Sequence, residues 1–158
     1  MVGIQGTGIR WNASMPNCYS NKSNGPGVSQ LIKVNSLSPE IPLVSVIIPT
    51  CNRTEQLSEA ITSVLKQTYL TIEIIIVDDG SAIDVADVLR SSFPDNICWL
   101  RHEHSQGAGA ARNTGLLHAS GVFIAFLDDD DRWYPEKLER QVAVFLRNRS
   151  DLVLVGCG

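Results

Sequence analysis

Apolar stretches alternate with amphipathic stretches along most of the chain. Continuous apolar runs, typical of strands that are buried on both faces, occupy residues 43–49, 72–77, 97–100, 122–127 and 151–155. Between these runs, polar segments carry apolar residues at helical spacing. They predict helices over residues 54–65, 84–92 and 108–119, and a last helix that begins at Pro135. Thr54 is the expected N-cap of the first helix.

Strands that alternate with helices predict an α/β fold, a Rossmann-like and mostly parallel sheet flanked by helices. In a parallel sheet the carboxyl ends of the strands lie along one edge, and ligands bind in the crevice there. Polar residues follow four of the predicted strands, at residues 50–53, 78–81, 101–104 and 128–131. We therefore expect these four clusters, which are far apart in the sequence, to meet in one site.

The N-terminal part of the chain differs in composition from the rest. Residues 1–41 are rich in Ser, Asn, Gly and Pro, and their few aliphatic residues have no sustained period, which is typical of a flexible leader. Residues 42–158 form the predicted domain. Because the chain stops after the fifth predicted strand, we expect this domain to be incomplete at its C-terminus.

Charge and the N-terminal sequence narrow the range of partners. The 158 residues carry a net charge of -4, which argues against binding to nucleic acid. The four cysteines form no CxxC pair, so that a zinc site is not indicated. The N-terminus lacks the basic start and apolar core of a secretory signal. We predict a cytoplasmic protein, and peripheral association with a membrane stays open.

The segment VFIAFLDDDDRW, residues 122–133, places four carboxylates directly after an apolar strand. Two carboxylates that are about 4 Å apart repel by roughly 4 kcal/mol at an effective dielectric constant near 20. A divalent cation, Mg²⁺ or Mn²⁺, would relieve this repulsion, and such a cation uses one or two carboxylates together with phosphates and water. The alternative is a solvated loop that caps the following helix. We expect one or two aspartates to bind metal and the others to cap or to be solvated.

The segment QGAGAARNTG is a second candidate for binding a phosphate-bearing ligand. Gly107 and Gly109 allow close approach to the backbone, and Arg112 offers a fork of donors. A turn and a tight helix contact explain the two glycines equally well. The chain contains no GxxxxGK[ST] segment, and no complete GxGxxG follows the first strand, which argues against P-loop and dinucleotide sites.

Several blocks of the sequence, in order, resemble the start of a family 2 glycosyltransferase. They are VSVIIPTCNR, IEIIIVDDGS and GAGAARNTGLLHASGVFIAFLDDDDRWYPEKLERQV, and the likeness runs from about Leu43 to Phe145. The resemblance implies the glycosyltransferase A-type fold, a nucleoside-diphosphate sugar donor, most simply a UDP-sugar, and a divalent metal. It also implies that this chain is the N-terminal, donor-binding portion of such an enzyme, typical of cell-wall or polysaccharide biosynthesis.

By resemblance, eight residues would bind the nucleotide sugar: Thr50, Asn52, Arg53, Asp78, Asp79, Arg112, Asp128 and Asp129. Among them, Asn52 and Arg53 would shape the turn after the first strand. Asp79 would face the base, with Asp78 supporting it, and Asp128 would lie towards the ribose.

By the same resemblance, the aspartate run would be the DxD segment of the family. Asp130 would bind the metal, but because the run contains four acids, the register is ambiguous by one and Asp131 is a rival. We expect replacement of Asp129 by alanine to be tolerated. His102 and His104, which flank Glu103, are interpreted as loop histidines beside the donor site.

The resemblance implies transfer of the sugar to an acceptor hydroxyl of an unidentified glycan, lipid or protein. In inverting members the catalytic base comes from a later segment, so that no base is assigned here. A non-catalytic module that binds a nucleotide sugar is therefore an alternative. A phosphotransfer domain of the receiver type, suggested by VDDGS, is a third and weaker one.

Overall fold

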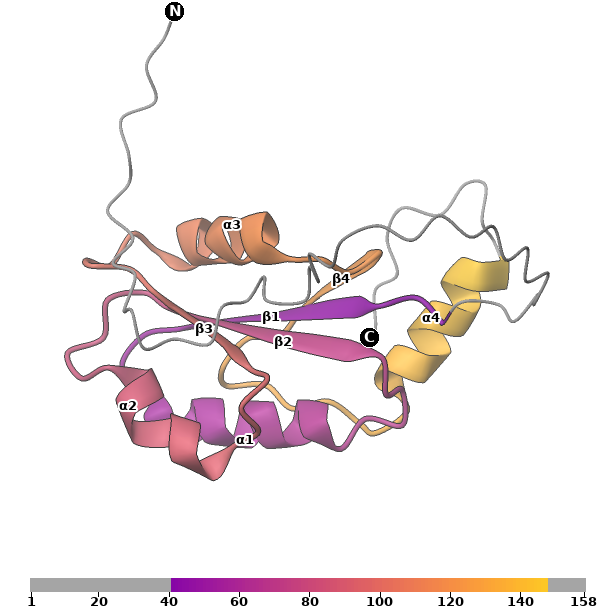
Figure 1. The fold of residues 1–158 in the computed structure, drawn as a ribbon, viewed down its shortest axis with the longest axis horizontal. Coiled ribbons are helices and arrows are strands. Elements are labelled where there is room, and N and C mark those ends of the chain that lie inside the picture. The colour runs from indigo at the N-terminus through magenta and orange to yellow at the C-terminus, as the bar shows by residue number, and fades with distance from the viewer. Residues whose placement is uncertain (1–40, 148–158) are drawn as a thin grey trace, which may run out of the picture.

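The computed structural model describes residues 41–147 of the chain (Figure 1). The leader predicted over residues 1–41 lies outside these residues except for its last position, and the predicted fifth strand lies wholly outside them. The described part is a parallel sheet with helices on both faces, which confirms the predicted α/β fold.

Four parallel strands form the sheet, in the order β3-β2-β1-β4. Their bounds are β1 Val44–Thr50, β2 Ile72–Asp78, β3 Cys98–Arg101 and β4 Phe123–Phe126. Each of them overlaps a predicted strand, and the bounds differ by one residue at most ends. All seven residues of β1 are buried, because this strand has a neighbour on each side and helices above and below.

The helices cover the sheet in two layers. In Figure 1, α1 and α2 lie below the sheet and α3 lies above it. The bounds are α1 Thr54–Leu65, α2 Val85–Leu89 with the 3-10 turn η1 Arg90–Ser92 after it, α3 Ala108–His118, and α4 Lys137–Arg147. Through Leu138 and Val142, α4 packs into the same core cluster as α1. In the described part of the chain, no helix has the length and apolar character that crossing a bilayer requires.

Successive residues of each strand point to opposite faces of the sheet. Val46 and Ile48 of β1 belong to the larger core cluster, which the sheet shares with α1, α2 and α4. Ile47, between them, belongs to a smaller cluster with Ala111 of α3. The continuous apolar runs in the sequence therefore arise because both faces of these strands are covered.

The predicted N-cap of the first helix and the predicted start of the last helix are wrong. Thr54 is already helical, and Arg53 occupies the N-cap position without a capping side-chain hydrogen bond. The last helix begins at Lys137, not at Pro135. The physical reason for the second difference is tertiary: the carbonyl of Pro135 accepts a hydrogen bond from the amide of Thr68, 2.9 Å away, so that it is held by the loop after α1.

Candidate functional site

The carboxyl ends of β1, β2 and β3 are level with one another. In the sheet register, Thr50 of β1 pairs with Asp78 of β2, which pairs with Arg101 of β3. The ladder continues beyond the strands, because the amide of Asp79 donates to the carbonyl of Thr50 and the amide of His102 donates to the carbonyl of Asp78, both at 2.8 Å. The gathering of distant polar clusters along one edge, predicted from the alternation of strands and helices, is confirmed.

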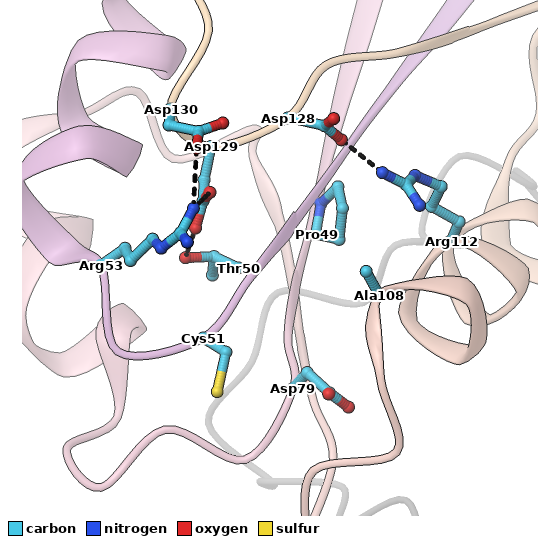
Figure 2. Close-up of a pocket in the computed structure, with 10 residues that line it drawn as sticks. All are labelled: Pro49, Thr50, Cys51, Arg53, Asp79, Ala108, Arg112, Asp128, Asp129 and Asp130. Carbon is cyan, nitrogen blue, oxygen red and sulfur yellow. Dashed lines mark hydrogen bonds and ion pairs between the residues drawn. The ribbon is translucent and has the colours of Figure 1, made fainter.

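A cavity of about 320 Å³ opens at this edge (Figure 2). Its size lies in the range of ligand pockets. The residues that line it come from the ends of β1, β2 and β4 and from the first turns of α3: Pro49, Thr50, Cys51, Arg53, Asp79, Ala108, Arg112, Asp128, Asp129 and Asp130. Seven of the ten residues predicted to bind nucleotide sugar or metal line this cavity, and the other three, Asn52, Asp78 and Asp131, do not.

Asn52 fixes the turn after β1. Its backbone is left-handed, with φ of 57°, a conformation that asparagine tolerates better than most residues. Its amide donates to the hydroxyl of Ser81 and its side-chain oxygen accepts from the amide of Ala82, both at 2.8 Å. Asn52 therefore shapes the turn, as predicted, and joins it to the turn after β2.

Asp78 is 1% exposed and serves the loop that follows β2. One carboxylate oxygen accepts from the amide and the hydroxyl of Ser81, and the other pairs with Arg101. None of these bonds reaches Asp79. Asp78 binds Ser81 and Arg101 in the structure, and its predicted support of Asp79 stays a prediction.

Asp79 lines the cavity, but its carboxylate is held by the protein itself. Oδ1 accepts from His102 at 2.7 Å and from the amide of Gln106 at 2.9 Å, and Oδ2 accepts from the hydroxyl of Ser105 at 2.7 Å and the amide of Gly107 at 2.8 Å. Burial alone would raise the pKa of Asp79, but these hydrogen bonds outweigh it and lower the pKa to about 2. Its predicted contact with a base stays a prediction.

A glycine next to Asp79 makes this arrangement possible. Gly80 has φ of 71°, and a Cβ at this position would lie 2.6 Å from the backbone nitrogen of Ser105. Only glycine lets the turn after β2 lie directly against the loop after β3, from which the hydrogen bonds to Asp79 come.

Asp129 is the buried member of the aspartate run. It is 6% exposed, and its carboxylate accepts from the hydroxyl of Thr50 at 2.8 Å and from Arg53 at 3.1 Å. These bonds join the loop after β4 to the end of β1. The expectation that alanine is tolerated at Asp129 does not fit this environment, because the substitution would leave the Thr50 hydroxyl without its acceptor.

Asp128 and Asp130 are the exposed members of the run, with side chains that are 51% and 58% exposed. Each is paired with one arginine: Asp130 with Arg53 at 2.9 Å, and Asp128 with Arg112 of α3. In Figure 2 these two pairs lie on opposite sides of the cavity. The hydrogen bond to Asp129, together with the charges of Asp129 and Asp130, raises the pKa of Arg53.

Asp131, the rival for the metal, is exposed and lies outside the cavity. Its amide donates to the carbonyl of Asp128 at 3.0 Å, which closes a turn of the backbone. Of the two metal candidates, only Asp130 therefore has its carboxylate on the cavity wall.

His102 follows β3 and lies directly behind Asp79, a residue of the cavity wall. It is buried, 2% exposed, and does not itself line the cavity, whereas His104 is exposed. The period-two pattern contained a signal: Leu100 packs under α3 with Ala111, and His102 continues the same face of β3.

The cavity wall is suited to bind a divalent cation together with an anion. Within residues 41–147, no three His, Cys, Asp or Glu side chains are arranged to hold a metal ion by themselves. Asp128 and Asp130 are nevertheless two exposed carboxylates that line the cavity. Mg²⁺ typically takes one or two carboxylates and completes its shell with phosphates and water, so that the donor set fits a metal that arrives with a phosphate ligand.

Comparison with known proteins decides the family. A model of Glycosyl transferase family 2 matches residues 45–158. The chain belongs to this family. Among the curated members, the UDP-Glc:alpha-D-GlcNAc-diphosphoundecaprenol beta-1,3-glucosyltransferase WfgD of Escherichia coli is 44% identical over 106 residues, which are 67% of this chain and 42% of that protein.

Two solved structures share the fold of this family 2 chain. The mannosyltransferase PcManGT from Pyrobaculum calidifontis, in complex with GDP-Man and Mn²⁺, superposes with a TM-score of 0.61 at 27% identity, over 66% of this chain and 32% of that one. S. aureus TarS 1–349 in complex with UDP-GlcNAc superposes with a TM-score of 0.63 at 28% identity, over 73% and 37%. The chain spans less than half of the length of each of these three relatives.

Proposed function

We propose that this chain binds a nucleoside-diphosphate sugar, with a UDP-sugar as the first candidate, in the cavity at the carboxyl edge of its sheet. A Mg²⁺ or Mn²⁺ ion at Asp130 would bind with the donor. In the whole protein, the sugar would pass to a hydroxyl of an acceptor glycan, lipid or protein. The support is the family of the chain, and the two structural relatives that were solved with GDP-Man and with UDP-GlcNAc.

The observation that carries the proposal is the charge of the cavity. Four carboxylates and two guanidinium groups line it, a net charge of -2. The diphosphate of a sugar nucleotide is itself an anion and would be repelled by such a wall. A divalent cation at the exposed carboxylates cancels the excess, which explains why anionic side chains are suitable in a site for an anionic donor.

Each part of the wall would have its own task. Arg53 and Arg112 carry forks of donors that match phosphate oxygens, and each is paired now with a carboxylate that a cation can take over. Asp130 would hold the cation, and Thr50 and Asp129 would keep the two loops together behind it. When bound, the metal supplies positive charge to the diphosphate as the bond from the sugar to the phosphate breaks.

Calorimetry tests donor binding directly. UDP, GDP, UDP-GlcNAc and GDP-Man are titrated into the protein with Mn²⁺, with Mg²⁺ and with EDTA. We expect binding of a nucleoside diphosphate with either metal and a loss of affinity of about tenfold or more in EDTA. If no nucleotide binds in the presence of metal, the proposed function is wrong. Equal affinity for the nucleotide in EDTA would show that donor binding does not require a metal ion.

Cys51 offers a second test that needs no turnover. It is a free thiol that is partly exposed and lines the cavity. Alkylation with iodoacetamide, followed by mass spectrometry of the peptide that contains Cys51, should be slowed by UDP with Mn²⁺ and not by UDP with EDTA. Adenosine with Mn²⁺, which has no diphosphate, is the matched control ligand. Equal rates of alkylation with and without nucleotide would contradict binding in this cavity.

A donor-hydrolysis assay separates transfer from binding alone. Release of UDP from UDP-GlcNAc in the presence of Mn²⁺ would show that the chain also assists cleavage of the donor. Metal-dependent binding without any release would favour the alternative of a module that binds a nucleotide sugar without transferring it.

A further inference from the structure

A buried histidine connects the donor cavity to the middle of α3. Nδ1 of His102 lies 2.7 Å from Oδ1 of Asp79, and Nε2 lies 2.8 Å from Oγ1 of Thr114. The side chain of His102 is 2% exposed, so that both ring nitrogens depend on these two partners for their hydrogen bonds.

The charge of Asp79 determines the direction of these hydrogen bonds. Because the pKa of Asp79 is about 2, its carboxylate is ionised near neutral pH and only accepts. Nδ1 of His102 therefore carries a hydrogen and donates it. In the tautomer with its only hydrogen on Nδ1, Nε2 is an acceptor and the hydroxyl of Thr114 donates to it. In this tautomer the chain of donors runs from Thr114 through His102 to Asp79.

This order of hydroxyl, imidazole and carboxylate also occurs in hydrolytic triads. A nucleophilic role does not fit here, because neither Thr114 nor His102 lines the cavity. A structural role, in which these hydrogen bonds position α3, fits better.

The connection holds α3 at two points along its length. Asp79 accepts from the amides of Gln106 and Gly107, just before the helix begins, and His102 holds Thr114 on the helix itself. Between these points lies Arg112, whose guanidinium pairs with Asp128 at the cavity. Movement of α3 along the sheet would therefore shift Arg112 relative to Asp128.

Packing against the sheet fixes the distance between α3 and the sheet, but it does not fix the position of α3 along the strands. A Cβ at Gly115 would lie 2.4 Å from Cγ2 of Ile47, so that the helix lies directly on β1 at this point. Ala111, one turn earlier, is fully buried in the same contact. Apolar contacts are non-directional, whereas the hydrogen bond from Thr114 has a defined direction and length.

We propose that His102 is a positioning residue for the donor site. It sets the position of α3 through Asp79 and Thr114, and thereby holds Arg112 where it faces the diphosphate, without touching the donor itself. The part that concerns the donor rests on the proposed function, whereas the part that concerns α3 can be measured without any ligand.

Hydrogen exchange in the ligand-free protein tests the positioning of α3. His102→Asn keeps an amide near Nδ1 but does not reach Thr114, and Thr114→Val removes only the hydroxyl. We expect each variant to speed amide exchange in residues 108–112 by about fivefold, the loss of one hydrogen bond. Thr62→Val is the matched control, because the Thr62 hydroxyl bonds to the carbonyl of Ser58 within α1. Unchanged exchange in both variants would overturn the proposal.

Donor affinity tests the route through Arg112. In calorimetry with UDP and Mn²⁺, Thr114→Val should raise Kd about three- to tenfold in the natural protein. In an Arg112→Ala background the same substitution should change Kd less than twofold, because Arg112 is the group it positions. An equal loss in both backgrounds would show that Thr114 acts by another route, and the proposal would be wrong. If UDP binds to no form, the proposed function fails, while the exchange experiment still decides the role of His102 in α3.

The protonation of His102 has a spectroscopic signature. Nitrogen chemical shifts of the imidazole should report a hydrogen on Nδ1, which donates it to Asp79, and Thr114→Val should move the Nε2 signal and not the Nδ1 signal. A ring that is protonated only on Nε2 would contradict the direction of the chain of donors.

Discussion

The acidic residues at the ends of β2 and β4 have the same side chain and very different surroundings. At the end of β2, Asp78 and Asp79 are 1% and 3% exposed and are held by loop amides, hydroxyls, Arg101 and His102. After β4, the exposed carboxylates of Asp128 and Asp130 are each paired with an arginine. The hydrogen bonds of a carboxylate therefore decide its role: the first pair holds the loops in place, and the second is available to a ligand.

The largest expected effect tests the availability of the β4 carboxylates. Asp130→Ala should weaken metal-dependent binding of UDP by about 100-fold, several kcal/mol, because the carboxylate on the cavity wall is the proposed contact with the cation. Asp131→Ala, one residue further and outside the cavity, is the matched control and should change Kd less than twofold. Calorimetry with Mn²⁺ measures both. Equal losses of affinity in the two variants would show that Asp130 and Asp131 both contact the metal, and that the alignment of the aspartate run with the DxD segment is still ambiguous.

The next effect tests the structural role of the β2 carboxylates. The pKa of Asp79 is lowered in the folded protein from 3.8 to about 2. Its contribution to the free energy of unfolding is therefore present above about pH 4 and is lost as the pH falls towards 2, and it amounts to about 2 kcal/mol. Asp79→Asn should remove this contribution at pH 7 and flatten the fall in stability in acid.

Urea denaturation at several pH values between 7 and 2.5 measures this contribution. Asp95→Asn is the control, since Asp95 is an exposed residue in the loop before β3. If Asp79→Asn were as stable as the natural protein at pH 7, the assignment of Asp79 to the loops would fail.

Asp129 shares one property with each of these two groups of aspartates. It belongs to the β4 run but is 6% exposed, like the β2 carboxylates. Asp129→Ala should lower the free energy of unfolding by about 1–3 kcal/mol, because Thr50 loses the acceptor of its hydroxyl. Thermal melts of Asp129→Ala and Asp128→Ala should show a lower Tm for the first only. A lower Tm for Asp128→Ala as well would contradict the distinction between buried and exposed members of the run.

The smallest effect concerns the arginine partners. Arg112→Ala should change the free energy of unfolding by less than about 1 kcal/mol, because its ion pair with Asp128 is partly exposed. The same substitution should raise Kd for UDP with Mn²⁺ about five- to tenfold, through the loss of a charge-assisted hydrogen bond to phosphate. Calorimetry and urea denaturation separate the two quantities. A large loss of stability with unchanged Kd would make Arg112 a structural residue.

Much of the fold could be predicted because its determinants are local. The continuous apolar runs of β1 and β2 indicate strands that are buried on both faces. The helical spacing of apolar residues in α1 indicates a helix that is buried on one face. The helix starts were less predictable, since the backbone before α4 is held by Thr68, whose partner at Pro135 is 67 residues away.

The sequence by itself determined that acidic residues follow two strands of a parallel sheet and that these strand ends meet along one edge. Only the tertiary structure decided which carboxylates are free, because the groups that hold Asp79, namely His102, Ser105, Gln106 and Gly107, come from a loop more than twenty residues away. Whether an oxygen is satisfied depends on the distance and direction to such partners, and these follow from the packing of the loops and not from the period of the sequence.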